Sequence, residues 1–136
     1  MTHEALSATH CAAFTDTRGW SAKEFAQLLE QSGVILCGDA KSFVLGRVIA
    51  DEAEVLTLAT LPALQGQGLA TTQLAAFVET VKQLGAARLF LEVAADNEAA
   101  QALYNKANFT IAGHRPNYYQ RQDGMWVDAI VMEKAL

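Results

Sequence analysis

Long apolar segments are absent from this sequence. None of its 136 residues fall in a run of about 18 consecutive apolar residues, the minimum for a membrane-spanning helix. The chain opens Met1-Thr2-His3-Glu4, without the basic segment and apolar run that mark a secretory signal. We therefore expect a cytoplasmic protein that does not contact a membrane.

Cysteine, proline and positive charge are also scarce. The chain has two prolines and two cysteines, Cys11 and Cys37, which lack the spacing of metal ligands and are expected to be free thiols. His3, His10 and His114 show no metal spacing either, so we expect structural or surface histidines and no metal site. Acidic residues outnumber Lys and Arg by 15 to 10, which argues against a nucleic-acid-binding surface.

Hydrophobic residues make up 51% of the sequence and charged residues 18%. That balance is typical of a globular chain with a buried core. The length fits one domain, and neither repeats nor low-complexity linkers divide it. We expect a single domain over residues 1–136.

Hydrophobic spacing and capping signals predict about four helices. Ser21 followed by Glu24 is a capping-box pattern that starts one of them. Gly33 and Gly85 mark two helix ends. The predicted helices cover residues 4–14, 21–33, 69–85 and 97–104.

Short apolar runs between turn residues predict the strands, at residues 34–37, 43–49, 55–60, 88–93, 109–112 and 126–132. The first three are joined by short turns, one of them at Gly38-Asp39, so they should be antiparallel. A helix connects the third strand to the fourth, which makes that pair parallel. The sequence predicts an α/β (α+β) fold with a mixed sheet of six or seven strands.

The segment from Gln65 to Ala70 is rich in glycine and opens the third helix. Backbone N–H groups and the helix dipole converge there, which makes an anion site suited to pyrophosphate. A flexible turn that caps the helix is an equally good explanation of Gly66 and Gly68 alone.

Two other phosphate motifs fit this segment less well. A P-loop requires Lys-Ser/Thr after the last glycine, where this chain has Leu69-Ala70. A dinucleotide fingerprint lacks its third glycine because Thr71 stands there, and Pro62–Gln65 separates the loop from the preceding strand. Glu92 could still supply the acidic residue of that fingerprint, so a nucleotide-binding oxidoreductase stays open as a minor alternative.

Several motifs together resemble the GCN5-related N-acetyltransferase (GNAT) family. Gln65-x-x-Gly68-x-Ala70 is similar to the family's Gln/Arg-x-x-Gly-x-Gly/Ala signature, and 91–93, 97–100 and 102–104 resemble its second half. Trp20-Ser21 and Asn117-Tyr118-Tyr119 resemble the RimI-type ribosomal-protein-alanine N-acetyltransferases in particular. The likeness runs from about Trp20 to the C-terminus, and the family's usual first strand has no counterpart.

The resemblance implies acetyl-CoA as cosubstrate, bound between a splayed central pair of parallel strands. It implies Glu92 as general base and Tyr104 as general acid. A backbone N–H near the end of the strand at 55–60 would polarise the thioester, and we expect a β-bulge there. The implied cofactor-binding residues are Leu58, Ala59, Thr60, Gln65, Gly66, Gln67, Gly68, Leu69, Ala70, Thr71, Asn97 and Tyr104.

Each role has a plainer structural alternative. Strand alternation places Phe90 and Glu92 on one face among apolar neighbours, where a carboxylate holds its proton more tightly, but Glu92 could equally be a solvent-facing residue. Tyr104 could be ordinary core packing, and Asn97 could only cap its helix. Neither cysteine has an activating neighbour, so we expect direct transfer in a ternary complex.

The acceptor is expected to be an N-terminal alanine of a ribosomal protein. The alternatives are a small-molecule amine or a lysine on the same fold, and a non-catalytic acyl-CoA sensor. Tyr118, Tyr119 and Trp126 could line a peptide groove, although packing is the commoner role of strand aromatics. We expect a monomer or a weak homodimer.

Overall fold

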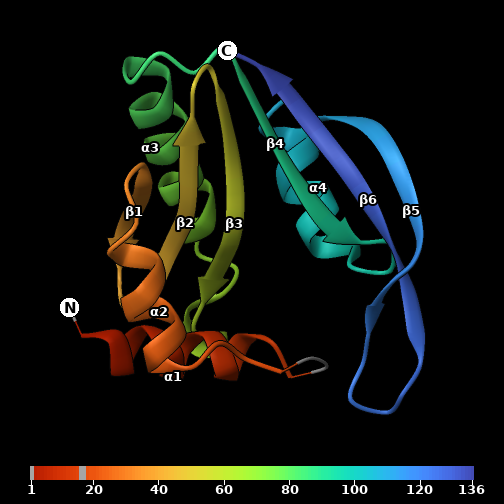
Figure 1. Ribbon diagram of the computed structural model, residues 1–136. Coiled ribbons are helices and arrows are strands. Elements are labelled where there is room, and N and C mark those ends of the chain that lie inside the picture. Colours follow the sequence, from red (N-terminus) through yellow and green to blue (C-terminus); the bar gives the residue numbers. More distant parts are fainter. Residues whose placement is uncertain (1, 16–17) are drawn as a thin grey trace.

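The computed structural model describes residues 2–15 and 18–136, so Met1, Asp16 and Thr17 lie outside the described residues. The described chain forms one mixed sheet of six strands in the order β1-β2-β3-β4-β6-β5 (Figure 1). Its elements are α1 (His3–Ala13), α2 (Ala22–Leu29), β1 (Val34–Asp39), β2 (Ser42–Ile49), β3 (Glu52–Thr60), η1 (Pro62–Leu64), α3 (Leu69–Gln83), β4 (Arg88–Ala94), α4 (Glu98–Lys106), β5 (Thr110–Gln120) and β6 (Trp126–Ala135). None of the described helices is long and apolar enough to cross a membrane.

Local hydrogen bonds fix where the first two helices begin. Thr2 Oγ1 accepts the Ala5 N–H at 3.0 Å and caps α1. The predicted capping box of α2 is confirmed, because Ser21 Oγ accepts the Glu24 N–H at 3.1 Å and Glu24 Oε1 accepts the Ser21 N–H at 3.2 Å. Both caps satisfy backbone donors that a helix start leaves without partners.

The antiparallel arrangement of β1, β2 and β3 is confirmed. The first hairpin turn, however, falls at Ala40-Lys41 and not at the predicted Gly38-Asp39. Asp39 explains the shift, because its Oδ1 accepts the N–H groups of Lys41 at 2.9 Å and Ser42 at 3.1 Å. A side chain that closes the turn in this way lets the ladder continue through Asp39 itself.

The parallel pair β3 and β4 is joined only at its start. Its register pairs Glu52 with Arg88, Ala53 with Leu89 and Glu54 with Phe90, and no later residue of the described strands pairs. Beyond that point the strands diverge, which leaves an open V in the middle of the sheet (Figure 1). The splayed central pair expected from the family resemblance is therefore present.

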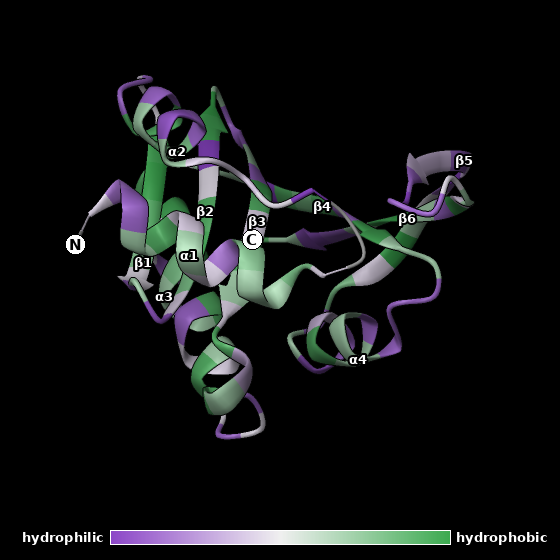
Figure 2. Cartoon of the chain, turned by 90° about the horizontal axis from the view of Figure 1, so that it is seen from below, coloured by the Kyte–Doolittle hydropathy of each residue, from purple (hydrophilic) through white to green (hydrophobic). Residues whose placement is uncertain are grey.

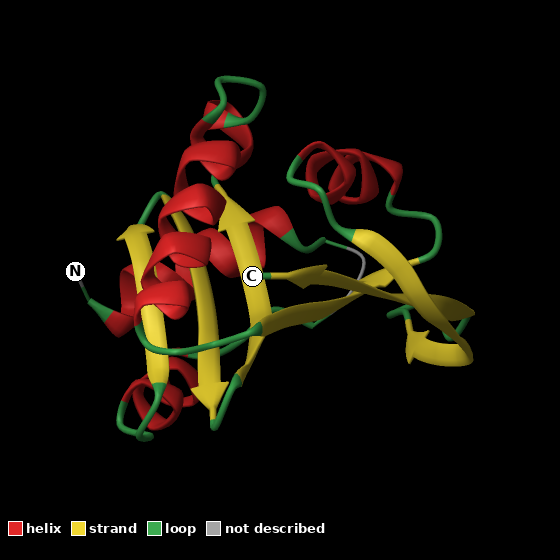
Figure 3. Ribbon diagram, turned by 90° about the horizontal axis from the view of Figure 1, so that it is seen from above, coloured by secondary structure: helices red, strands yellow, loops and turns green. Residues whose placement is uncertain are grey.

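Helices cover the two faces of the sheet unequally. Figure 3 shows α3 and α4 on one face and α2 on the other, over the half formed by the first strands. The larger core lies on the α3–α4 face and includes Phe77, Leu89 and Leu91. A smaller core under α1 and α2 includes Phe25 and Phe43.

On the α2 side, no helix of the described chain lies over the half of the sheet formed by β4, β6 and β5 (Figure 3). We call this surface the open face. Figure 2 shows hydrophobic residues along β1 and β2 and hydrophilic residues on the outer side of α2. Hydrophobic residues are therefore concentrated on the strands that α1 and α2 cover.

The last hairpin is longer than the sequence predicts. The strand expected to stop at residue 112 continues as β5 to Gln120. Its ladder with β6 is interrupted between Arg115 and Tyr119, where Pro116 offers no N–H and Asn117 has a positive φ of 50°. The interruption explains why the alternation of apolar and polar residues did not predict the second half of β5, since the residues after it pair with β6 in a shifted register.

Candidate active site

The V between β3 and β4 lies at the edge of the open face, where β4 borders the opening. Strand alternation places Phe90 and Glu92 on this face and Leu89, Leu91 and Val93 in the larger core on the other, as predicted. Because β4 pairs with β6 along its whole length, Glu92 is held opposite Val131. A rigid ladder on one side therefore positions the carboxylate at the edge of the opening.

The bulge expected at the end of β3 lies earlier. Leu45 pairs with Thr57 and Gly46 pairs with Val55, which leaves Leu56 as the extra residue instead of the predicted 58–60 segment. Leu56 lines the hollow beneath α2, and Thr57 bonds to His10 of α1 on the same face. Two successive side chains thus face α1 and α2, which fixes the bulge at this position.

Gly46 opposite the bulge was not recognised from the sequence. A Cβ at this position would overlap the ring of Phe77 and the carbonyl oxygen of Glu54. A glycine inside a strand is a signal for a bulge or a close backbone approach, and here both occur.

The glycine loop lies between β3 and α3. Gly66 and Gly68 both have φ of +81°, and a Cβ on either would meet no atom within 4 Å. Their conformation and not crowding therefore selects glycine. Gln65 Nε2 donates to the Thr60 carbonyl at 3.2 Å, which ties the loop to the end of β3.

The first turn of α3 faces this loop with its backbone donors. The first i→i−4 hydrogen bond of α3 joins the Thr72 N–H to the Gly68 carbonyl at 3.1 Å. The N–H groups of the residues just before Thr72 therefore have no acceptor within the helix. With the dipole of the 15-residue helix, they form an anion site. The space around the two glycines is open, so the backbone of the loop is accessible from outside.

Glu92 does not stand alone among apolar side chains, as the sequence suggested. Its Oε1 lies 3.3 Å from Arg115 Nε, and its side chain is 19% exposed. Tyr118 is a second neighbour, and the Glu92 carboxylate is the main cause that raises the pKa of its phenol. Both neighbours come from β5, on the far side of β6.

Tyr104 lies on the other face of β4. It is buried in the larger core and packs against Phe109 with ring centroids 5.7 Å apart. Burial, with a smaller contribution from Tyr119, raises the pKa of Tyr104 to about 12. The phenol therefore keeps its proton at neutral pH.

Asn97 caps α4, since its Oδ1 accepts the Ala100 N–H at 3.1 Å. The structural role proposed for this residue from the sequence is thus confirmed. The remaining implied cofactor residues gather near one place: 58–60 at the end of β3, 65–68 in the loop and 69–71 in the first turn of α3.

His10 joins the α1–α2 segment to the sheet. Its Nδ1 accepts the Trp20 N–H at 3.0 Å, so Nε2 carries the hydrogen that is donated to Thr57 Oγ1 at 3.0 Å. The ring stacks between Phe14 and Trp20, with centroids 4.5 and 4.9 Å away. The expectation of a structural histidine holds for His10.

The β5–β6 hairpin forms the opposite side of the open face. Tyr118 and Trp126 are exposed and do not pack in the core, whereas Tyr119 is half-buried. Asp128 holds the interrupted segment, because its Oδ1 accepts the Asn117 N–H at 2.8 Å and its Oδ2 contacts His114 Nε2 at 2.9 Å. Those contacts lower the pKa of Asp128, the Asn117 bond contributing most.

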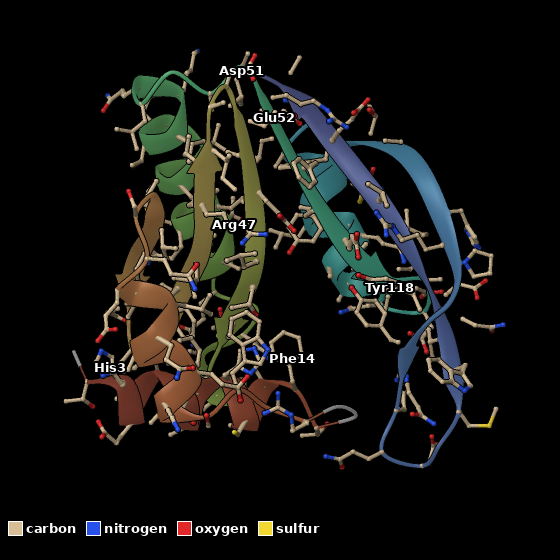
Figure 4. The ribbon with its side chains drawn as sticks, viewed as in Figure 1. His3, Phe14, Arg47, Asp51, Glu52 and Tyr118 are labelled. Carbon is tan, nitrogen blue, oxygen red and sulfur yellow. The ribbon has the colours of Figure 1, made fainter. Side chains whose placement is uncertain are left out.

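Two shallow hollows adjoin the opening. The first, about 410 Å³, lies between α2 and β3 and is lined by Trp20 and Leu56 among others. The second, about 290 Å³, is lined by Glu54 and Phe90 among others, and Arg47 lines both. Figure 4 shows Arg47 and Tyr118 reaching toward the gap between β3 and β4 from opposite sides.

Sequence reasoning missed Arg115. The residue follows the predicted end of its strand, and nothing in its neighbours indicates a partner on β4. Only the β5–β6–β4 ladder brings it to Glu92.

The geometry agrees with comparisons with known proteins. Residues 5–109 match the acetyltransferase (GNAT) family. A ribosomal protein bS18-alanine N-acetyltransferase of Escherichia coli is 40% identical over 95 residues, which cover 70% of this chain and 64% of that protein.

Solved structures repeat the fold. The crystal structure of the ribosomal-protein-S18-alanine N-acetyltransferase from Escherichia coli superposes with a TM-score of 0.87 at 33% identity, covering 98% of this chain and 86% of that one. Arabidopsis thaliana NAA60 in complex with acetyl-CoA has a TM-score of 0.85 at 16% identity, over 98% of this chain and 93% of that one, which is a likeness of fold alone. The chain belongs to the acetyltransferase (GNAT) family.

Proposed function

We propose that this protein is an N-acetyltransferase that moves the acetyl group of acetyl-CoA to the α-amine of a protein N-terminus. The N-terminal alanine of ribosomal protein bS18 is the acceptor we propose first, from the names of the relatives. The observation that carries the proposal is the divergence of β3 and β4 beside Glu92, with the glycine loop at the foot of the opening.

The cosubstrate would lie in the V. Backbone N–H groups of the loop and of the α3 first turn (65–71) would hold the pyrophosphate, and Asn97 would face the pantetheine arm. NAA60, which has the same fold, was solved with acetyl-CoA, and this supports acetyl-CoA as the cosubstrate. The backbone at 58–60, which has no β4 partner, would offer an N–H to the thioester oxygen and stabilise charge as it develops there.

Glu92 and Tyr104 would move the two protons of the reaction. Glu92 takes a proton from the acceptor amine, directly or through water, so that nitrogen can form its bond to the acetyl carbon. As the carbon–sulfur bond breaks, Tyr104 donates its phenolic proton to the departing thiolate. The two residues lie on opposite faces of β4, so each can reach one side of a thioester threaded through the opening.

The test is acetyl transfer to a peptide with the bS18 N-terminal sequence, beside the same peptide with a blocked N-terminus and a free internal lysine. Transfer to the free N-terminus alone is expected. Transfer only to the lysine would contradict the α-amine assignment. If neither peptide is acetylated although acetyl-CoA binds, small amines are the next acceptors to test, and a non-catalytic acyl-CoA sensor is the alternative that is left.

The assigned base is tested by Glu92→Gln, which should lower kcat by about 100-fold or more while acetyl-CoA binding persists. Glu133→Gln is the matched control, because Glu133 lies on the same face but pairs with Arg88 at 2.6 Å. Equal activity in the two variants would rule out Glu92 as the base.

A further inference from the structure

Arg115 brings a positive charge to the carboxylate that is proposed to receive the acceptor amine. The Arg115 side chain is 55% exposed and the Glu92 side chain only 19%. Their atoms lie 3.3 Å apart, longer than the roughly 2.7–2.9 Å of a strong charge-assisted hydrogen bond. The carboxylate is thus enclosed, whereas the cation beside it is loosely held and mostly in water.

The same guanidinium has a second partner. Its central carbon lies 5.4 Å from the centroid of the Tyr118 ring, within the range of a cation–π contact. Tyr118 in turn lies near Glu92, whose carboxylate is the main cause that raises the pKa of the Tyr118 phenol. Arg115 therefore contacts a carboxylate and an aromatic face at the same time, so the guanidinium can leave Glu92 and keep the Tyr118 ring as a partner.

Two other arginines beside the opening pair with carboxylates other than Glu92. Arg88 contacts Glu52 at 3.0 Å and Glu133 at 2.6 Å, so two carboxylates on neighbouring strands fix it. Arg47 pairs with Glu54 at 3.3 Å and is more enclosed than Arg115. Of these three arginines, Arg115 alone pairs with the proposed base.

We propose that Arg115 is an internal competitor of the acceptor: in the free enzyme its guanidinium occupies the place on Glu92 that the acceptor's ammonium takes, and acceptor binding displaces it from Glu92 while it keeps its contact with the Tyr118 ring. The inference rests on the proposed role of Glu92. Both cations need the same carboxylate, and an N-terminally blocked peptide without lysine, which carries no ammonium group, cannot displace the guanidinium. Arg115 is thus a residue that sets selectivity for a charged amine.

Steady-state kinetics test this with Arg115→Gln. Because an exposed ion pair contributes little, its loss should lower the KM for the acceptor by only about threefold, with kcat and the KM for acetyl-CoA unchanged. Arg115→Lys keeps the cation and should restore the original KM. Arg88→Gln is the matched control and should leave the acceptor KM unaltered.

The opposite sign overturns the proposal. A higher acceptor KM, an unchanged one, or a lower kcat alone in Arg115→Gln would make Arg115 an anchor of Glu92 or a bystander and not a competitor.

A second measurement needs no turnover. In ¹H–¹⁵N spectra, the Nε–Hε signal of Arg115 should move in Glu92→Gln. In the original protein it should move when a peptide with a free N-terminus is added, but not when a blocked peptide without lysine is added. A signal that responds to Glu92→Gln in a protein that acetylates no peptide would reject the proposed function alone. A signal that ignores both Glu92→Gln and the free peptide would reject the competitor.

Discussion

Lowering the pH from 7 to 5 is expected to destabilise this fold through one residue, His10. Burial lowers the pKa of His10 from 6.5 to about 4, while nearby Glu24 opposes the shift. The folded pKa lies below the unfolded one, so the unfolded chain binds the proton first. The stability is complete above pH 6.5 and is lost as the pH falls from 6.5 toward 4. A shift of this size costs about 2 kcal/mol at pH 5.

The structure explains why the buried His10 ring resists protonation. His10 Nδ1 already accepts the Trp20 N–H, so a second proton there would break that bond and place a charge between two aromatic rings. Because Trp20 lines the hollow beside the opening, its release should loosen the α1–α2 side of the site as well.

Urea unfolding at pH 7 and pH 5 measures the effect. His10→Gln should be less stable at pH 7 but should lose most of the pH-dependent difference. His114→Gln, which changes an exposed histidine paired with Asp128, is the control and should keep that difference. The reasoning is refuted if His10→Gln loses as much stability between the two pH values as the original protein does.

Two further variants test the bulge and the loop. Gly46→Ala would press a Cβ against Phe77 and the Glu54 carbonyl and should lower the free energy of unfolding, measured in urea, by about 1–3 kcal/mol. Gly113→Ala is the control and should cost far less, because its Cβ would meet nothing closer than 3.8 Å. Similar costs for the two variants would contradict the close approach at Gly46. Gln67→Lys adds a cation beside the helix N-terminus and should tighten acetyl-CoA binding about threefold at low salt, measured by calorimetry; a gain that persists at high salt would not be electrostatic.

Much of this architecture could be predicted because it is encoded in neighbouring residues. The capping box at Ser21 and Glu24, the alternation of β4 around Glu92 and the helix after Gly68 depend on contacts a few positions apart. Their predictions were confirmed in position or nearly so. The turn after β1 was misplaced because the Asp39 side chain, and not the glycine beside it, closes the hairpin.

The sequence by itself determined the mixed sheet, the helices and the glycine loop, since hydrophobic period and turn chemistry act locally. Only the tertiary structure decided the bulge at Leu56, the full length of β5 and the contact of Arg115 with Glu92. Each of these depends on the register between strands distant in the chain. The sequence of one strand does not determine which residue of a distant strand pairs with it. The neighbours of Glu92 therefore follow only from the pairing of β4 with β6 and of β6 with β5.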